Sequence, residues 1–162
     1  MRDMIERHTA PAKQGLYDPR FEHDSCGVGF VVNLQGRKSH SIVQKAIEVL
    51  INLEHRGACG CEKNTGDGAG ISVQTPHTFF VAECATLKIS LPGFGDYGVG
   101  MIFLPTETSD REQVEQLFEG IVRDEGQTVL GWRNVPTDDS AIGPTAKGSE
   151  PVVRQIFIGR KQ

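Results

Sequence analysis

The sequence changes character at Cys26, and this change constrains the fold more than any other feature. Residues 1–25 are polar and irregular, and they show neither the two-residue period of a strand nor the 3.6-residue period of a helix. Residues 26–34 are then a short apolar run with two early glycines, ended by Gln35 and Gly36. We expect residues 1–25 to be a leader or flexible arm, residues 26–162 to be the folded domain, and residues 26–34 to be a buried strand.

Two segments have the sequence signature of an amphipathic helix. Ser41 and Gln44 have the spacing of a capping box. The apolar residues that then recur on one helical face are Ile42, Val43, Ala46, Ile47, Leu50 and Leu53. Ser109 and Glu112 have the same spacing. The apolar stripe that follows them consists of Val114, Leu117, Phe118, Ile121 and Val122. The patterns predict one helix over residues 41–54 and another that begins near Ser109.

The rest of the chain has the pattern of short strands separated by turns. The predicted strands are residues 71–75, 97–104, 128–133 and 151–158. The first ends at Pro76, the second at Pro105, and the last starts on Pro151. Residues 79–87 have the composition of a short helix, and residues 54–70 and 135–149 that of loops. Strands and helices that alternate without a fixed βαβ period predict an α+β fold or a layered arrangement of sheet and helices.

Length and charge limit the classes of function. A chain of 162 residues with 38% hydrophobic residues is long enough for one domain with a core of its own. The net charge of −4 and pI near 5.7 favour neither nucleic acid nor an anionic membrane surface as a partner, because both attract basic surfaces. No segment has the eighteen or so continuous apolar residues of a spanning helix, and the first residues lack the apolar run of a secretory signal. We therefore expect a cytoplasmic protein.

The four cysteines, Cys26, Cys59, Cys61 and Cys84, match no disulfide framework of a small secreted protein, and we expect them to be reduced thiols. Cys59, Cys61 and His55 are an alternative zinc set. Zinc usually takes four ligands, however, and the common spacing has two or more residues between paired cysteines, whereas here there is one. Thiols packed in a loop are the preferred interpretation, and no metal site is expected.

Cys26 lies where a chain cleavage would have a chemical consequence. If the bond between Ser25 and Cys26 were cut, one residue would carry both a thiol and a free α-amine, and an α-amine with a pKa of about 8 can act as a base near neutral pH. Gly27 and Gly29 would let a substrate or a loop approach closely. The alternative is an ordinary buried core thiol, and position alone favours that alternative.

The glycine-rich segment from Asn64 to Gly70 invites a phosphate-binding interpretation, which the sequence does not support. The lysine and the following serine or threonine of a P-loop are missing, and a run of glycines alone is a weak signal. His40 and His77 have no partner in the sequence pattern and are expected to be surface or packing residues.

Several segments together resemble the start of the glutamate synthase large subunit. The segments are Leu16-Tyr17-Asp18-Pro19, Glu22-His23-Asp24-Ser25-Cys26-Gly27-Val28-Gly29-Phe30, Glu54-His55-Arg56-Gly57-Ala58, Asn64-Thr65-Gly66-Asp67-Gly68-Ala69-Gly70-Ile71, Leu130-Gly131-Trp132-Arg133-Asn134-Val135-Pro136, Ser149-Glu150-Pro151 and Gln155-Ile156-Phe157-Ile158. Each is weak alone, but their order and spacing are specific. The resemblance covers nearly everything from Leu16 onward.

The resemblance implies a class II glutamine amidotransferase domain with the N-terminal-nucleophile fold, in which two antiparallel sheets lie between layers of helices (an αββα sandwich), with only its N-terminal portion present. It implies that the leader is removed and that Cys26 attacks the side-chain amide of L-glutamine, giving a thioester and ammonia. Arg56 matches an arginine that shapes the site, and a guanidinium near a cysteine favours the thiolate. Gly57 matches a residue that presents its backbone to the substrate. Without the resemblance, Arg56 would be a solvated cation at a helix end.

The resemblance also implies that this chain is a fragment, a truncated reading frame or a split subunit that needs its other half. The arginine that holds the α-carboxylate of glutamine and the Asn-Gly pair that stabilises the oxyanion are expected downstream, and loss of an oxyanion donor costs about a hundred- to a thousand-fold in rate. No cofactor is expected in this chain, whereas FMN and an iron–sulfur cluster are implied for the complete enzyme. The implied partners are the rest of the large subunit and a small subunit. Two alternatives stay open: another class II amidotransferase, which the leader disfavours, and an inactive remnant that serves as an interaction module.

Overall fold

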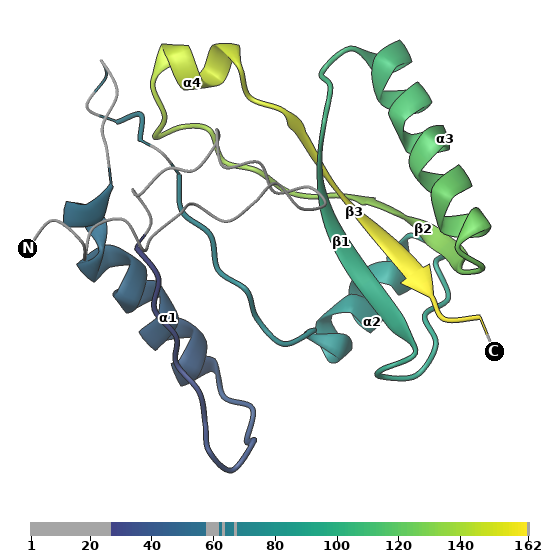
Figure 1. The fold of residues 1–162 in the computed structure, drawn as a ribbon, viewed down its shortest axis with the longest axis horizontal. Helices are drawn as coiled ribbons and strands as arrows, with labels where there is room; N and C mark the ends of the chain where they lie inside the picture. Colours follow the sequence, from purple (N-terminus) through teal and green to yellow (C-terminus); the bar gives the residue numbers. More distant parts are fainter. Residues whose placement is uncertain (1–26, 58–61, 63, 67, 162) are drawn as a thin grey trace, which may run out of the picture. The chain divides into compact units, whose positions relative to one another are not determined.

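A computed structural model of the chain describes residues 27–57, 62, 64–66 and 68–161. The chain divides into two compact units, Met1–Ala58 and Cys59–Gln162. Each unit is described by itself, because the positions of the parts relative to one another are not determined (Figure 1). Among the described residues, no helix is both long and apolar enough to cross a bilayer.

The first unit contains helix α1 (His40–Asn52), followed by one turn of 3-10 helix, η2 (Glu54–Arg56). The helix predicted over residues 41–54 is thus confirmed, with a different start. Ser39 is the N-cap, and its side-chain oxygen accepts a hydrogen bond from the backbone N–H of Ser41. Ser41 therefore lies inside the first turn instead of capping it, because Ser39 already supplies the oxygen that an N-cap requires.

The buried strand predicted over residues 26–34 is wrong for the part that the structure describes. Residues 27–33 have no strand pairing. Most large apolar side chains between residues 27 and 34 are open to solvent, with 87% exposure for Val28, 88% for Phe30 and 96% for Leu34. A strand is stabilised by hydrogen bonds to a neighbouring strand. Among the described residues of this unit no strand is present to pair with it. Gly29 instead lies directly against the side chain of Val49 in α1.

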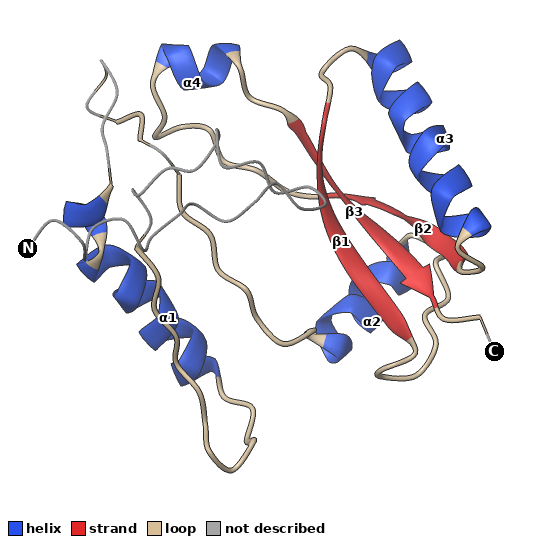
Figure 2. Ribbon diagram, viewed as in Figure 1, coloured by secondary structure: helices blue, strands red, loops and turns tan. Residues whose placement is uncertain are grey.

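The second unit is built on a three-stranded antiparallel sheet of β1 (Tyr97–Leu104), β2 (Thr128–Asn134) and β3 (Val152–Gly159) (Figure 2). The strand order is β1-β3-β2, so the last strand is the central one. These three strands confirm the predictions to within one residue at each end. The strand predicted over residues 71–75 is wrong, since these residues form no strand and the side chains of Ile71 and Val73 are exposed.

Helices α2 (His77–Thr86) and α3 (Thr108–Asp124) pack on opposite faces of this sheet. Phe80 of α2 meets Phe157 of β3 edge-to-face, with ring centroids 5.2 Å apart. Phe118 of α3 meets Trp132 of β2, which lies opposite Ile156 in the strand register. Neighbouring residues of a strand point to opposite faces of the sheet. Helix α2 therefore packs on the face that carries Phe157, and α3 packs on the face that carries Ile156. Both residues are fully buried.

The second predicted helix is confirmed, but its predicted cap is wrong. Helix α3 begins at Thr108, its N-cap is Glu107 without a side-chain capping bond, and Ser109 bonds to the neighbouring Asp110 instead. The turn before it is held by Arg111, whose Nη1 donates to the carbonyl oxygens of two residues that follow β1.

The short helix predicted over 79–87 is confirmed as α2. Within the predicted loop 135–149, a five-residue helix is present, α4 (Pro144–Gly148).

Strand β2 contains an irregularity that requires a glycine. The register of β2 against β3 shifts between Val129 and Gly131. Gly131 has a φ of +157°, and a Cβ there would lie 2.8 Å from two side-chain carbons of Ile89. Together, the described helices and the small antiparallel sheet form a mixed helix and strand structure, which agrees with the predicted α+β class.

Candidate functional site

The predicted nucleophile, Cys26, lies outside the described residues, and the description begins at Gly27. Just beyond it, Gly29 approaches α1 so closely that a Cβ would collide with the side chain of Val49. The second glycine after the predicted nucleophile therefore has a packing role within its own unit. This agrees with the expectation that a glycine here permits close approach.

Arg56 and Gly57 lie at the end of the 3-10 turn that follows helix α1. Arg56 is the last residue of the 3-10 turn η2, and its side chain lies outside the described part of the structure. The backbone N–H of Gly57 donates to the carbonyl oxygen of Glu54 at 3.0 Å, which closes the turn. Gly57 is exposed and has an extended backbone, with φ −80° and ψ 152°. The peptide after the turn is therefore open to solvent, as a backbone that contacts a substrate must be.

His55, the described member of the alternative zinc set, is hydrogen-bonded to the end of the preceding helix, α1. Its Nδ1 lies 2.9 Å from the carbonyl oxygen of Asn52, and the residue is exposed. Cys59 and Cys61 lie outside the described residues. Among the residues that are described, no three His, Cys, Asp or Glu side chains gather closely enough to hold a metal ion.

The start of the glycine-rich segment is tied to helix α4 and to the loop before it, within the second unit. The Glu62 carboxylate accepts hydrogen bonds from the hydroxyl of Thr65 at 2.8 Å and from the backbone N–H of Thr145 at 3.2 Å. Asn64 Nδ2 also donates to the carbonyl oxygen of Ala141 at 3.1 Å. The Thr65 hydrogen bond, with those from Thr145, lowers the pKa of Glu62 below its ordinary value of 4.5. These bonds support a structural role for the segment.

The Trp132-Arg133 motif that contributes to the resemblance also has a structural role. Arg133 is buried, and its Nη2 and Nε donate to Glu83 of α2 at 2.6 and 3.1 Å. Its Nη1 donates to Gln155 of β3 at 3.0 Å. Arg133 thus joins α2 to two strands of the sheet through charge-assisted hydrogen bonds. The sequence pattern gave no sign of this pairing, because the three residues are far apart along the chain.

Cys84 of α2 is fully buried and belongs to the core formed with Phe80, Tyr97 and Phe157. Burial in this apolar environment raises the pKa of its thiol above the ordinary value of 9.0. A thiol with a raised pKa and no exposure is a poor nucleophile. Cys84 is therefore a packing residue, as expected for a reduced thiol outside the candidate site.

Comparison with known proteins shows the family. The family model described as "Glutamine amidotransferases class-II" matches residues 26–162, which is most of the chain. The chain belongs to the class II glutamine amidotransferases. The matched region begins at Cys26, the residue at which the sequence changes character.

The relatives that the chain resembles are glutamate synthases. It is 46% identical over 149 residues to the glutamate synthase [NADPH] large chain of Bacillus subtilis, a match that covers 92% of this chain. It is 42% identical over 153 residues to glutamate synthase [NADH] of Saccharomyces cerevisiae, and 41% over 137 residues to ferredoxin-dependent glutamate synthase 2 of Synechocystis, covering 91% and 85% of this chain. The matches span 10%, 7% and 9% of these three proteins, so the chain corresponds to about a tenth of their length or less.

Proposed function

We propose that this chain is the glutamine-hydrolysing region of a glutamate synthase, with Cys26 as the nucleophile after removal of residues 1–25. The observation that carries the proposal is the family match, which starts at Cys26 and runs to residue 162. The similarity to glutamate synthases from a bacterium, a yeast and a cyanobacterium supports the assignment of the particular family member. We propose the N-terminal-nucleophile fold for the complete domain.

The proposed reaction has two stages. The Cys26 sulfur attacks the side-chain carbonyl carbon of glutamine, and the α-amine of the same residue accepts the thiol proton. The tetrahedral intermediate then collapses, the C–N bond breaks, and the amine returns the proton to the leaving group, which departs as ammonia. Water hydrolyses the resulting thioester to give glutamate and the free thiol. The amine is suited to both transfers because its intrinsic pKa of about 8 lies near the working pH.

Arg56 and Gly57 are proposed to complete the part of the site that this chain contributes. A guanidinium beside Cys26 would favour the thiolate and bind carboxylate in a bidentate manner. The exposed peptide at Gly57 offers a backbone group to the substrate, and the 3-10 turn fixes that peptide at the end of α1. Both assignments rest on the position of these residues in the motif from Glu54 to Ala58.

In the whole protein we propose L-glutamine as the substrate and the remaining segments of the large subunit as the partner of this region, with a small subunit as a further partner. FMN and an iron–sulfur cluster are assigned to those other segments. Among the residues described here, Cys84 is committed to the core and no cluster of metal-binding side chains is present.

A labelling experiment tests the proposal. The protein should be treated with an electrophilic glutamine analogue, and the modified peptide identified by mass spectrometry. We expect stoichiometric modification at Cys26 that glutamine competes away, together with loss of ammonia release in the Cys26→Ser variant of the full protein. The matched control is Cys84→Ser, which should still be labelled at Cys26. Labelling spread over several cysteines, or ammonia release that survives Cys26→Ser, would overturn the assignment.

Arg56→Ala separates a role in the site from a role in the fold. If Arg56 lies beside the nucleophile, the variant should lose kcat/KM for glutamine while its melting temperature stays close to that of the parent. Arg37→Ala is the control, since it removes an exposed guanidinium outside the motif. A large fall in melting temperature with unchanged kinetics would show that Arg56 supports the fold instead.

A further inference from the structure

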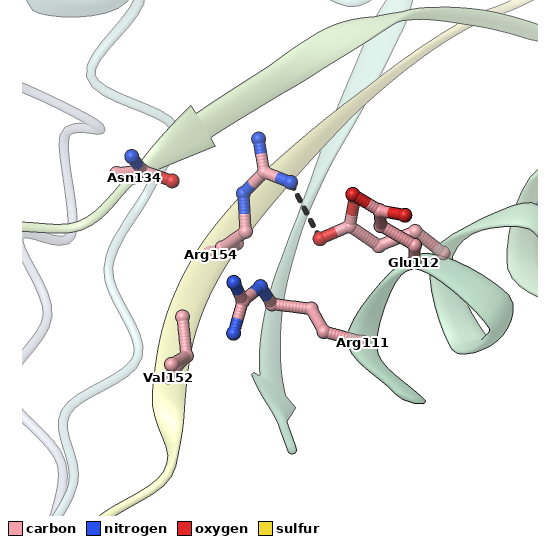
Figure 3. A pocket seen from close by; sticks show the side chains of 6 residues that line it. Arg111, Glu112, Asn134, Val152 and Arg154 are labelled. Carbon is pink, nitrogen blue, oxygen red and sulfur yellow. Dashed lines mark hydrogen bonds and ion pairs between the residues drawn. The ribbon is translucent and has the colours of Figure 1, made fainter. Parts of the chain in front are cut away.

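A surface cavity of about 360 Å³, open to solvent, lies beside the first turns of α3, where they approach β2 and β3 (Figure 3). The residues that line it are Arg111, Glu112, Glu115, Asn134, Val152 and Arg154. All six belong to the second unit, and none is part of the proposed nucleophile site. Five of the six are polar or charged, which suits a small polar ligand better than an apolar one.

Arg154 is held firmly but leaves hydrogen-bond donors unused. Its Nη1 donates to Glu115 Oε1 at 2.5 Å, and the two side chains are only 22% and 15% exposed. Its guanidinium also lies over the ring of Trp132, 5.4 Å from the ring centroid. Among the described residues, Glu115 is its one hydrogen-bond acceptor, and the buried Nε has none. The buried Nε is out of reach of a ligand, but three of the four N–H donors on Nη1 and Nη2 have no acceptor among the described residues, so Arg154 can bind a further acceptor through them.

Arg111 is fixed by its own turn. Its Nη1 donates to the carbonyl oxygens of Pro105 and Thr106 at 3.2 and 2.9 Å, and its Nη2 donates to the hydroxyl of Thr108 at 3.1 Å. These bonds use three of its five donors. Figure 3 shows the guanidinium groups of Arg111 and Arg154 near one another in the space between β3 and α3. Two preorganised cations facing one space form a place for a carboxylate.

The carboxylates of the cavity decide which class of ligand fits. Glu115 is paired with Arg154, whereas Glu112 is exposed and forms no ion pair with any residue that the structure describes. The two arginines and two glutamates make the formal charge of the lining zero. A phosphate or other net anion would be attracted by the two arginines but repelled by Glu112. A metal cation would be attracted by Glu112 but repelled by the two arginines. A ligand that carries a carboxylate and an ammonium group, separated by one carbon, can pair with the arginines through the first group and with Glu112 through the second.

We propose that this cavity binds the zwitterionic head of a free α-amino acid. The carboxylate is received by Arg111 and the unused donors of Arg154, the ammonium group by Glu112, and the amide of Asn134 offers a further hydrogen bond. A cavity of this volume is at the small end of the range for ligand sites, about 300–1,000 Å³, and suits a molecule of amino-acid size. The site is independent of Cys26 and of glutamine hydrolysis.

Trp132 allows a direct test, because it is the sole tryptophan of the chain and contacts Arg154. Its indole Nε1–H donates to Glu119 at 2.9 Å and gives a single side-chain resonance. The full chain should be titrated with L-alanine, which has no side-chain amide and cannot be a substrate of glutamine hydrolysis. We expect a saturable shift of the indole resonance. Propionate lacks the ammonium group and ethylamine lacks the carboxylate. Each should bind at least about tenfold more weakly than L-alanine, because each loses charge-assisted hydrogen bonds.

Two variants assign the binding to the cavity. Glu112→Gln removes the exposed carboxylate without breaking an ion pair to a described residue, and it should weaken L-alanine binding about tenfold or more. Arg111→Gln should weaken it similarly. The matched controls are Glu125→Gln and Arg160→Gln, which make the same charge changes at exposed positions outside the cavity and should leave binding unchanged. The proposal is overturned if L-alanine gives no saturable shift, if propionate binds as well as L-alanine, or if Glu112→Gln binds L-alanine like the parent.

Discussion

The two compact units of the chain differ in how far they bury their own apolar side chains. In the first unit, no described side chain between residues 27 and 57 is buried, and the apolar stripe of α1 is at best half-buried, with Ile47 46% exposed. In the second unit, Leu104, Ile156 and Phe157 have exposures of 2% or less. The residues proposed for catalysis thus belong to the unit that has little core of its own, whereas the unit with the sheet supplies most of the buried apolar surface.

The residues that stabilise the chain and the residues proposed for catalysis therefore lie in different units. Burial of apolar surface is the main favourable term in folding, so the sheet of the second unit should dominate the free energy of unfolding of this chain. The exposed apolar residues that follow Cys26 contribute little in the structure as it stands. Changes in the two units should therefore have effects of very different size.

A matched pair of phenylalanine substitutions gives the largest expected contrast. Phe157 is fully buried between α2 and the sheet, and Phe30 is 88% exposed. Phe157→Ala should lower the free energy of unfolding by about 3–5 kcal/mol because it leaves a cavity, whereas Phe30→Ala should change it by less than about 0.5 kcal/mol. Urea denaturation of the 162-residue chain measures both. Equal effects of the two substitutions would contradict the assignment of the core to the second unit.

A pair of glycine substitutions tests the bulge in β2. A Cβ at Gly131 would collide with Ile89, so Gly131→Ala should cost about 1–3 kcal/mol of stability. Gly120 lies inside α3 with nothing within 4 Å of its added Cβ, and Gly120→Ala should stabilise the chain by up to about 1 kcal/mol. Thermal unfolding of the two variants compares them. A Gly131→Ala variant as stable as the parent would show that β2 does not need the close approach.

Ser39→Ala tests the first unit. The Ser39 side chain caps α1, and its loss should cost the helix about 1 kcal/mol. Because α1 has no buried residue, the effect should be local. Hydrogen exchange should become faster at the amides of α1 while those of β3 keep their protection. A parallel loss of protection in both would show that the two units unfold together.

The smallest effect concerns alkaline pH. Burial raises the pKa of Cys84 above 9.0, so the folded state holds this proton more tightly than the unfolded state. The contribution to stability is complete below the unfolded pKa and is lost as the pH rises above it. The free energy of unfolding should therefore decline as the pH rises above the ordinary thiol value of 9.0, and the decline should be shallower in Cys84→Ala. Equal slopes in the two proteins would place the titration elsewhere, for example at Tyr97, whose pKa burial also raises.

Local pattern predicted the second unit better than the first. The strand at Tyr97–Leu104 was predicted with both ends correct, since an apolar run between a turn and Pro105 has few alternatives. The run after Cys26 has the same local character, yet it forms no strand between residues 27 and 33. Strand formation depends on a partner strand that is distant in sequence, and no local pattern encodes the presence of that partner.

The candidate site shows the same limit. The motif from Glu54 to Ala58 placed Arg56 and Gly57 at the end of a helix, and the structure has η2 one residue after the end of α1. The hydrogen bonds of Glu62 to Thr145 and of Arg133 to Glu83 were not predicted. Each joins residues 50 or more positions apart, and pairing over such separations depends on tertiary structure.

The most direct test of Cys26 as a terminal nucleophile is peptide mapping of the protein isolated from cells that make it with its remaining segments. We expect the mature polypeptide to begin with Cys26 carrying a free α-amine, and peptides from residues 1–25 to be absent. A protein that retains an intact peptide bond between Ser25 and Cys26 would contradict this mechanism, because the cysteine would then have no amine of its own to move the proton.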